Sequence, residues 1–458
     1  EPIYLHRYAQ ALKGTNNFTE ADKWLAKYQE RNQGVTSNKI GTLNYFESLN
    51  KEIERPYIIH KTSLNSEGSD FVSSVLGNKL IFASTRNGGQ LYDWNNKPYL
   101  DLFIADIDDA GNASNIQPFS KSINTKMHES NAVLTADGKT MYFTRNNFIE
   151  GKKQSDSNKI THLKIYKAQL VNNEWTNISE LPFNGITYST EHPALSPDEK
   201  KLYFSSDMSG GIGSFDIYVV TINSDGTYGA PQNLGATINT EQREQFPFIS
   251  SKNTLYFASD GHLGLGGLDV FKSEINSNSY SKPINLSTII NSSSDDFSFI
   301  IDEENETGYF ASNRPGGLGD DDIYKFTQTK KYYVQGFVQN KNTLEIIPGA
   351  TVTLFDTNNT KISEMTVGDA AAYSLEIENN KTYKIKGSSS KYNPSTIEFS
   401  TDAEGNIDKN ILLLLESYED AEKDIVVDNG KTQIKINPIY FDFDKWNIRT
   451  DAALELNN

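Results

Sequence analysis

One short strand pattern is written five times along this chain, and this repeat constrains the fold more than any other feature. Each copy has Phe at its centre, and a second apolar pattern follows after a polar loop. Internal repeats of about 50 residues that each contain several strands are typical of β-propellers. The central phenylalanines, 53 to 61 residues apart, are Phe82, Phe143, Phe204, Phe257 and Phe310. The sequence therefore predicts a mainly β chain with a five-bladed propeller over residues 57–328. Six blades are the alternative, if residues 330–339 add strands.

The last repeat lacks the outer strand that follows the other four. After Phe326 the composition changes, so no fourth strand follows there. A matching segment lies before the first repeat, where Leu64, Asn65 and Ser66 parallel residues 123–125, 238–240 and 290–292. We therefore expect residues 57–64 to complete the last blade, which closes the ring and leaves no open sheet edge.

The propeller is expected to be flanked by other domains. Residues 1–50 have the apolar spacing of helices, as at Tyr4, Tyr8 and Leu12. Residues 331–415 alternate between apolar and polar positions, as in a small β-sandwich that ends in a buried strand at 410–416. An acidic linker is predicted at 416–432. Residues 433–458 read as the first strand and part of the first helix of a further domain, which we expect to continue beyond Asn458.

Composition excludes several functional classes. The chain has 458 residues and no Cys, so disulfides, thiolate metal sites and Cys nucleophiles are ruled out. Its formal net charge is −17, which argues against nucleic acid as a partner, because phosphate binding needs a basic surface. No apolar run approaches the ~20 residues that a membrane-spanning helix needs.

An aspartate recurs where the third strand of a repeat begins, and it has two interpretations. It can be structural, accepting backbone hydrogen bonds where a loop meets a strand. It can also hold Ca²⁺, because the loop before Asp322 is rich in acidic residues and glycine. The structural interpretation is favoured, and no cofactor is expected. The residues concerned are Asp101, Asp216, Asp269 and Asp322.

The first two repeats carry long insertions between their second and third strands, at 85–99 and 146–162. Long loops on a rigid scaffold often carry binding residues. Aromatic side chains in these loops either bind a partner protein or pack into small cores under their own loops, and the sequence favours neither interpretation. The candidate partner-binding residues are Tyr92, Trp94, Tyr99 and Phe148.

Four segments resemble known families. Residues 193–204 resemble the strand pair of WD40-like, Tol-type propeller repeats, and residues 439–451 resemble the opening of OmpA-like peptidoglycan-binding domains. Residues 331–415 resemble the transthyretin-like domain that regulates some carboxypeptidases, with Gly336 and Tyr373 at matching positions. The N-terminal helices resemble a tetratricopeptide unit. Along the chain, the order is tetratricopeptide unit, propeller, transthyretin-like domain and OmpA-like domain. This domain order resembles that of the OmpA-family periplasmic proteins of the Bacteroidetes, which include the PorE component of the type IX secretion system.

The resemblance implies a function in the cell envelope. It implies a periplasmic scaffold, not an enzyme, that links an outer-membrane complex to peptidoglycan. The complex would serve type IX secretion, gliding or outer-membrane assembly, and a PorP/SprF-type barrel is the implied partner. The wall-contacting residues of the OmpA-like family would lie beyond Asn458. The alternatives are a sensor that binds envelope glycans or peptides, and an enzyme that cleaves envelope glycans.

Overall fold

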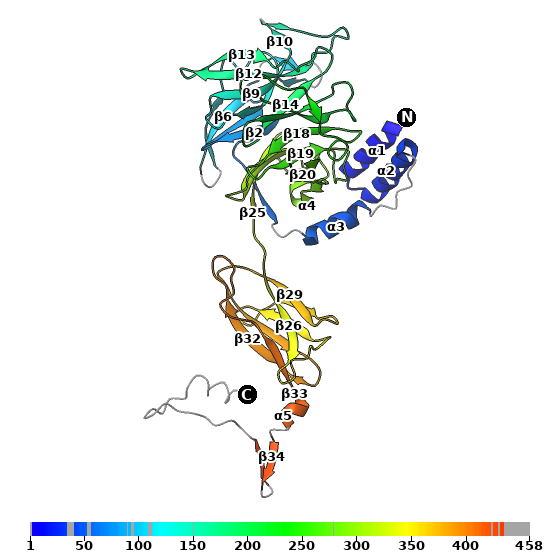
Figure 1. The fold of residues 1–458 in the computed structure, drawn as a ribbon, viewed down its shortest axis with the longest axis vertical. Coiled ribbons are helices and arrows are strands. Elements are labelled where there is room, and N and C mark those ends of the chain that lie inside the picture. The colour runs from blue at the N-terminus through cyan, green and yellow to red at the C-terminus, as the bar shows by residue number, and fades with distance from the viewer. Residues whose placement is uncertain are drawn as a thin grey trace. The chain divides into compact units, whose positions relative to one another are not determined.

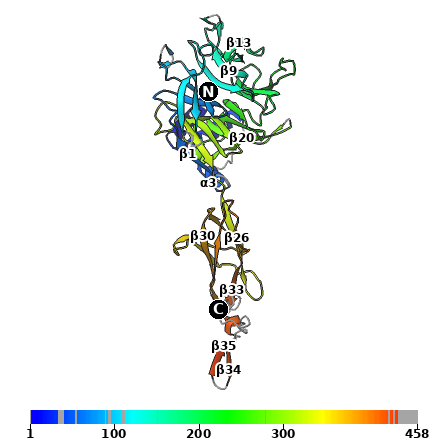
Figure 2. The same cartoon turned by 90° about the vertical axis from the view of Figure 1, so that its left-hand side faces the viewer.

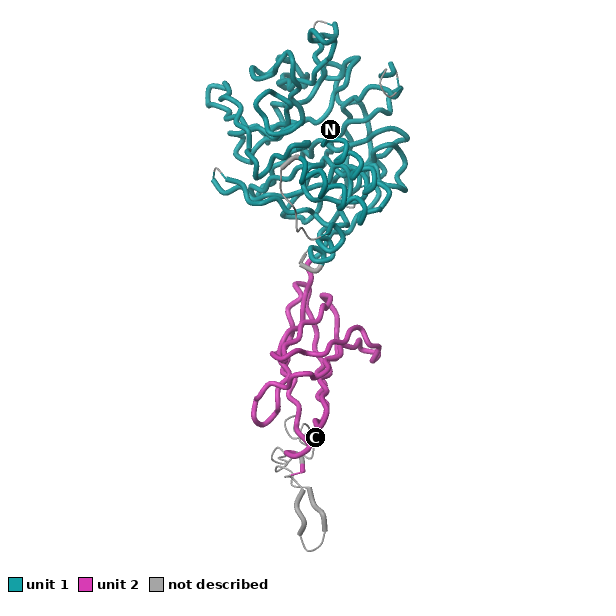
Figure 3. Tube along the Cα trace, turned by 90° about the vertical axis from the view of Figure 1, so that its right-hand side faces the viewer, with its two compact units in different colours: residues 1–329 teal, residues 330–458 magenta. Residues whose placement is uncertain are grey.

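The chain forms two compact units, Glu1–Thr329 and Lys330–Asn458 (Figure 3). The structure is a computed structural model. It describes residues 2–33, 41–52, 56–88, 90–92, 96–108, 112–149, 151–277, 279–422, 425–428 and 431–434.

The repeats of the first unit form antiparallel sheets whose strands follow one another in chain order (Figure 1). The first repeat contains β2 (Asp70–Leu76), β3 (Lys79–Ser84), β6 (Asp101–Ile107) and β7 (Ala113–Pro118). The second contains β8 (Glu129–Leu134), β9 (Thr140–Asn146), β12 (Leu163–Val171) and β13 (Glu174–Glu180). The third contains β14 (Thr190–Leu195), β15 (Lys201–Ser206), β16 (Asp216–Thr221) and β17 (Gln232–Asn233).

The last two repeats vary this plan. The fourth contains β18 (Glu244–Ile249), β19 (Thr254–Ser259) and β20 (Asp269–Asn276), and both β21 (Ser279–Tyr280) and β22 (Ile284–Asn285) pair with β20. The fifth contains β23 (Asp296–Asp302), β24 (Thr307–Ser312) and β25 (Asp322–Gln328). The insertions of the first two repeats form short hairpins, β4 (Leu91–Tyr92) with β5 (Lys97–Pro98) and β10 (Phe148–Ile149) with β11 (Lys152–Lys153).

The ring of sheets closes through the strand that precedes the first repeat. β1 (Tyr57–Lys61) pairs antiparallel with β25, from Tyr57 opposite Gln328 to Lys61 opposite Tyr324. The predicted closure is therefore confirmed. The inner strands β2, β8, β14, β18 and β23 contact one another in that order, and β23 contacts β2 again. This closed circle of sheets is a β-propeller.

The repeated phenylalanines explain why the sheets pack together. All five are fully buried in the layers between neighbouring sheets. Burying a side chain of this size stabilises the fold by roughly 1.5–3 kcal/mol. The repeat in the sequence is thus a repeat of core positions.

A repeated asparagine joins each sheet to the segment that leads into the next one. Its Oδ1 accepts the N–H, and its Nδ2 donates to the C=O, of one residue in the third strand, at distances between 2.7 and 3.2 Å. The side chain therefore acts as a short extra strand at the junction. The asparagines and their partners are Asn65 with Ile323, Asn124 with Leu102, Asn184 with Ile165, Asn239 with Ile217, and Asn291 with Val270.

The predicted N-terminal helices are α1 (Pro2–Gly14), α2 (Phe18–Gln33) and α3 (Thr42–Glu52). They contact a loop of the fourth repeat and the connection that leads into it: His6 Nε2 lies 3.1 Å from the carbonyl oxygen of Asp260, and the Tyr28 hydroxyl donates to Glu241 Oε2 at 2.6 Å. A short helix, α4 (Ser287–Ile290), lies in the connection between the fourth and fifth repeats. Within the described residues, no helix combines the length and apolarity that crossing a membrane requires.

The second unit contains two four-stranded sheets around one core (Figure 2). One sheet has the order β29 (Ala372–Ile377), β26 (Tyr332–Asn340), β33 (Leu413–Ser417) and β31 (Tyr392–Asn393). The other has the order β28 (Lys361–Thr366), β27 (Thr351–Phe355), β30 (Thr382–Ser388) and β32 (Ser395–Ser400).

Two sequence predictions for this unit need correction. The buried strand predicted at 410–416 begins later, as β33 at Leu413, and is only partly buried: Leu413 and Leu415 face the core, while Leu412, which precedes the strand, is 50% exposed. The predicted linker also contains α5 (Tyr418–Glu422) and a hairpin of β34 (Ile425–Asp428) and β35 (Lys431–Ile434). The OmpA-like segment 439–451 lies outside the described residues.

Candidate ligand-binding cavity

Every inner strand of the propeller is interrupted near its middle. The pairing of each inner strand with its neighbour shifts there, as in a β-bulge. In four strands a residue other than glycine has a positive φ at the interruption, and such outliers cluster at functional sites. These residues, with their φ angles, are Asn131 (35°), His192 (55°), Phe246 (52°) and Ser298 (53°).

The interrupted strands surround a cavity of ≈ 1130 Å³. Its lining comes from all five repeats: the second halves of the inner strands and the turns that follow them. The four positive-φ residues all line it. Because adjacent strands are antiparallel, these turns lie at the opposite end of the sheets from the insertions at 85–99 and 146–162. Ligand pockets typically have volumes of about 300–1,000 Å³, so this cavity is slightly larger than most and has room for a small molecule or a short chain segment.

His192 and Phe246 form a stacked pair in the lining. Their ring centroids are 3.7 Å apart and the ring planes differ by 17°. The backbone N–H of Phe246 donates to His192 Nδ1 at 3.3 Å, so the neutral ring carries its proton on Nε2. Burial lowers the pKa of His192 to about 3. Glu191 Oε1 lies 3.6 Å from Nδ1, but this contact is no ion pair, because His192 is neutral at physiological pH.

Three polar atoms in the lining have no hydrogen-bond partner. They are Asn131 Oδ1, Ser73 Oγ and Ser74 Oγ, and each atom is buried. Asn131 is only 8% exposed. An unsatisfied buried polar group costs about 1–3 kcal/mol. Because less than 1 Å² of each oxygen is accessible, the three atoms lie behind the surface of the cavity, which other atoms of these residues form.

The turns that line the cavity are acidic. Four carboxyl groups, those of Asp108, Glu199, Asp302 and Glu304, line the cavity together with a single ammonium group, that of Lys325. Glu199 Oε1 accepts the backbone N–H of Ala136 at 2.5 Å, which holds it at the turn. Backbone amides and Asn305 bind the Asp302 carboxylate, and the Asn305 hydrogen bond contributes most to lowering its pKa. The lining thus carries an excess of negative charge.

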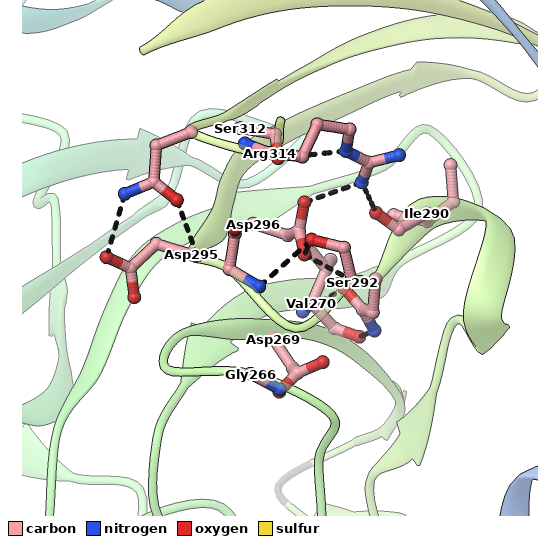
Figure 4. A network of polar contacts seen from close by, with 12 residues as sticks. Gly266, Asp269, Val270, Ile290, Ser292, Asp295, Asp296, Ser312 and Arg314 are labelled. Atoms are coloured by element: carbon pink, nitrogen blue, oxygen red, sulfur yellow. Dashed lines mark hydrogen bonds and ion pairs between the residues drawn. The ribbon is translucent and has the colours of Figure 1, made fainter. Parts of the chain in front are cut away.

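The repeated aspartates lie away from this cavity, where the third strands begin. Asp216 accepts backbone N–H groups from Ile212 at 2.5 Å and Gly213 at 3.0 Å, and Asp322 accepts the N–H of Leu318 at 2.9 Å. Asp269 accepts the N–H of Gly266 at 2.9 Å (Figure 4). Each side chain serves its own loop, which is the arrangement that the structural interpretation predicts.

The first two repeats depart from this pattern. Asp101 binds the side-chain amide of Asn87 at 2.9 Å, and burial raises its pKa. The second repeat has Lys164 at the equivalent position, and its ammonium group lies 2.8 Å from Glu180 Oε2. Among the described residues, no group of three or more His, Cys, Asp or Glu side chains has the arrangement of a metal site.

Two of the candidate partner-binding aromatics pack on a histidine. Tyr92 and Tyr99 lie with ring centroids 5.1 and 4.6 Å from that of His128, at the start of the second repeat. Phe148 is half-buried, and Trp94 lies outside the described residues. The first insertion is therefore anchored by Tyr92 and Tyr99, which pack on His128. Partner binding through the insertions stays a prediction.

The sequence analysis missed a second set of acidic side chains, which fix the starts of the inner strands. Asp296 accepts the backbone N–H of Ser292 at 2.5 Å and binds the Arg314 guanidinium at 2.6 Å (Figure 4). Glu244 likewise accepts the N–H of Thr240 at 2.7 Å. The signal was present in four of the five copies: Ser or Thr follows the repeated asparagine, and an acidic residue comes four positions later, whereas Gly185 follows Asn184. The cavity residues have no such signal, because the side chains at the interruptions follow no common pattern: Asn131, His192 and Phe246 occupy three of them.

Comparisons with known proteins show similarity in fold only. No protein-family model and no curated protein matches the sequence. Among solved structures, TolB from Acinetobacter baumannii is 15% identical over 60% of this chain, with a TM-score of 0.28, and the chain covers only 55% of that structure. An α-L-arabinofuranosidase from Lactobacillus brevis is 13% identical over 59% of this chain and 91% of its own, with a TM-score of 0.37.

A third match is a puromycin hydrolase, 12% identical over 78% of this chain and 55% of its own, with a TM-score of 0.33. These matches correct the expectation that the chain is not an enzyme. A glycoside hydrolase, the arabinofuranosidase and the puromycin hydrolase are among the structures that it resembles. A propeller is therefore no mark of a protein without catalytic activity. The likenesses are too distant to assign a reaction.

Proposed function

We propose that this chain is an envelope protein whose propeller binds a ligand, a glycan or a peptide segment, in the central cavity. One observation carries the proposal: the inner strands of all five repeats contribute to one cavity of ≈ 1130 Å³, and four of them do so with a positive-φ residue at a bulge. Backbone outliers of this kind cluster at functional sites.

Filling the cavity tests this proposal. Ser74→Phe adds a ring at a residue that lines the cavity, whereas Ser179→Phe places the same ring on the exposed outer strand β13. Soluble envelope oligosaccharides and a set of short peptides would be titrated against the full chain by calorimetry. We expect at least one ligand to bind the unchanged chain and the Ser179→Phe variant but not the Ser74→Phe variant. Equal binding to both variants would contradict the cavity as the site.

A second function rests on the sequence resemblance and on the separate second unit. We propose that the chain belongs to the OmpA-family periplasmic proteins, with tetratricopeptide-like helices, a five-bladed propeller and a transthyretin-like sandwich. In this proposal it links an outer-membrane protein complex to peptidoglycan through the domain that begins near residue 433. A ligand in the propeller would then be the part of the complex that the chain recognises.

Cell fractionation tests this second proposal. The chain should co-purify with solubilised outer membranes and should sediment with isolated peptidoglycan only when the region from residue 433 onward is present. Removal of that region should leave ligand binding by the propeller unchanged. Sedimentation that persists without the region would contradict the assignment of wall binding.

A further inference from the structure

We propose that Asn87 is a site of spontaneous deamidation, and that its conversion to aspartate or isoaspartate releases the first insertion from the third strand of its repeat. The site lies at the base of the loop at 85–99, at the opposite end of the sheets from the cavity, so the inference is independent of the proposed ligand. Three observations carry it: the glycine that follows Asn87, the exposure of both residues, and the side-chain hydrogen bond that deamidation removes.

Deamidation of asparagine depends on the residue that follows it. The backbone nitrogen of that residue, after losing its proton, attacks the side-chain carbonyl carbon of asparagine, so that a C–N bond forms and ammonia leaves. Water then opens the resulting five-membered succinimide at either carbonyl group, which gives aspartate or isoaspartate. A side chain on the following residue hinders the attack, and glycine has none. The chain has three Asn–Gly pairs, at 87–88, 184–185 and 429–430, of which the last lies outside the described residues.

The first pair is open to this reaction. Asn87 and Gly88 are both exposed, and a Cβ added to Gly88 would meet no atom within 4 Å. The N–H of Gly88 donates to the carbonyl oxygen of Thr85 at 3.4 Å, which is longer than the usual range of about 2.7–3.2 Å. The attacking nitrogen is therefore held only weakly, and open space surrounds the residue that carries it.

The fold protects the second pair. Asn184 is one of the repeated asparagines, and its Oδ1 accepts the N–H of Ile165 at 3.2 Å while its Nδ2 donates to the C=O of Ile165 at 2.9 Å. A Cβ added to Gly185 would collide with the ring of Tyr188, so this glycine is closely packed. The amide of Asn184 cannot turn toward the nitrogen of Gly185 without breaking both bonds. The two pairs have the same sequence and different surroundings, so each is a control for the other.

Deamidation of Asn87 removes a contact that joins the loop to the third strand. Asn87 Nδ2 donates to Asp101 Oδ2 at 2.9 Å, whereas Asp216 and Asp322 accept backbone N–H groups of their own loops. The product has a carboxyl group in place of this donor, so two acidic side chains come together and repel each other when both are charged. Burial already raises the pKa of Asp101, and the bond from Asn87 opposes that shift. The first insertion therefore loses an anchor at its base.

Peptide mass spectrometry of the full, folded chain after incubation at pH 8.5 tests the site. Deamidated peptides are recognised by the mass gained when an amide becomes an acid. We expect Asn87 to convert at least about tenfold faster than Asn184, a difference in barrier of ~1.4 kcal/mol. In concentrated urea, where the fold protects neither residue, the two rates should be similar. Equal rates in the folded chain, or no conversion of Asn87, would overturn the inference.

Variants test the consequence. Asn87→Gln should abolish the modification, because glutamine cyclises through a less favourable six-membered ring. Asn87→Asp supplies one product from the start and should speed hydrogen exchange in the described residues 85–88 and 96–99. Asn44→Asp, which adds the same charge at an exposed position on α3, should leave this exchange unchanged. Exchange as slow in Asn87→Asp as in the unchanged chain would overturn the proposed release of the insertion.

Discussion

In each repeat the side chain of a single asparagine forms hydrogen bonds with the backbone of the third strand, as a neighbouring strand would. Asn291 is fully buried, and it accepts the N–H of Val270 at 2.7 Å and donates to its C=O at 2.9 Å. Without the side chain, one buried donor and one buried acceptor of the backbone lose their partner. The asparagine is therefore a structural residue, although buried polar side chains in repeats can be mistaken for sites.

We expect Asn291→Ala to lower the free energy of unfolding of the propeller by about 2–3 kcal/mol, because it leaves buried polar groups unsatisfied. Urea denaturation followed by circular dichroism measures this. Asn44→Ala is the matched control, since Asn44 is exposed on α3, where alanine favours the helix. A loss of stability as small as that of the control would show that water replaces the asparagine.

Buried carboxyl groups predict a dependence of stability on pH. Burial raises the pKa of Glu191 to about 7 from an ordinary value of 4.5, and the pKa of Glu244 is raised to the same extent for the same reason. The folded state therefore holds protons that the unfolded state releases above pH 4.5. By linkage, the free energy of unfolding falls as the pH rises from 4.5 through 7.

Glu191→Gln should reduce this slope, because glutamine is neutral at every pH. The variant should gain stability relative to the unchanged chain between pH 5 and pH 8. Denaturation with urea at both pH values measures the difference, and Glu67→Gln, at an exposed position, should show no such gain. An unchanged slope in Glu191→Gln would mean that Glu191 is ionised in the folded state.

At the scale of elements, β1 determines whether the ring is closed. It pairs with β25 over its whole length, and Asn65, which follows β1, binds Ile323 with the same pair of bonds that the other asparagines make. The first and last repeats are thus joined like any two neighbours. An unpaired β25 would be an exposed edge, and edges of this kind promote aggregation.

Deleting residues 51–65 should abolish cooperative unfolding of the propeller or cause it to aggregate. Deleting residues 2–33, which removes α1 and α2 but keeps β1, should leave a cooperative transition at lower temperature. Scanning calorimetry distinguishes the two variants. A cooperative transition of normal enthalpy after loss of 51–65 would contradict closure by β1.

How far the elements could be predicted depended on whether a pattern repeats. The five phenylalanines mark core positions, so the sheets and their order followed from the sequence. β28 and β32 of the sandwich were missed, because half of their side chains are exposed and no repeat supports them. The cavity was missed for a related reason: its residues Asn131, His192 and Phe246 differ from repeat to repeat, and only the bulges bring them together.

At the scale of the whole molecule, the cavity and the second unit are structurally separate. The cavity belongs entirely to the first unit, and the second unit has a hydrophobic core of its own. Within the first unit, the insertions lie at one end of the sheets and the cavity opens among the turns at the other. Two different surfaces of the propeller are therefore available for two different ligands. We assign the proposed glycan or peptide ligand to the cavity.

Hydrogen exchange measured by mass spectrometry tests this assignment most directly. The full chain would be compared with and without a saturating concentration of a ligand that calorimetry shows to bind it. The account predicts slower exchange in the turns after the inner strands, at residues 74–78, 133–136, 195–199, 249–251 and 300–305, and unchanged exchange in the insertions at 85–99 and 146–162. Protection confined to the insertions or to the N-terminal helices, with the turns unchanged, would contradict the central cavity as the binding site.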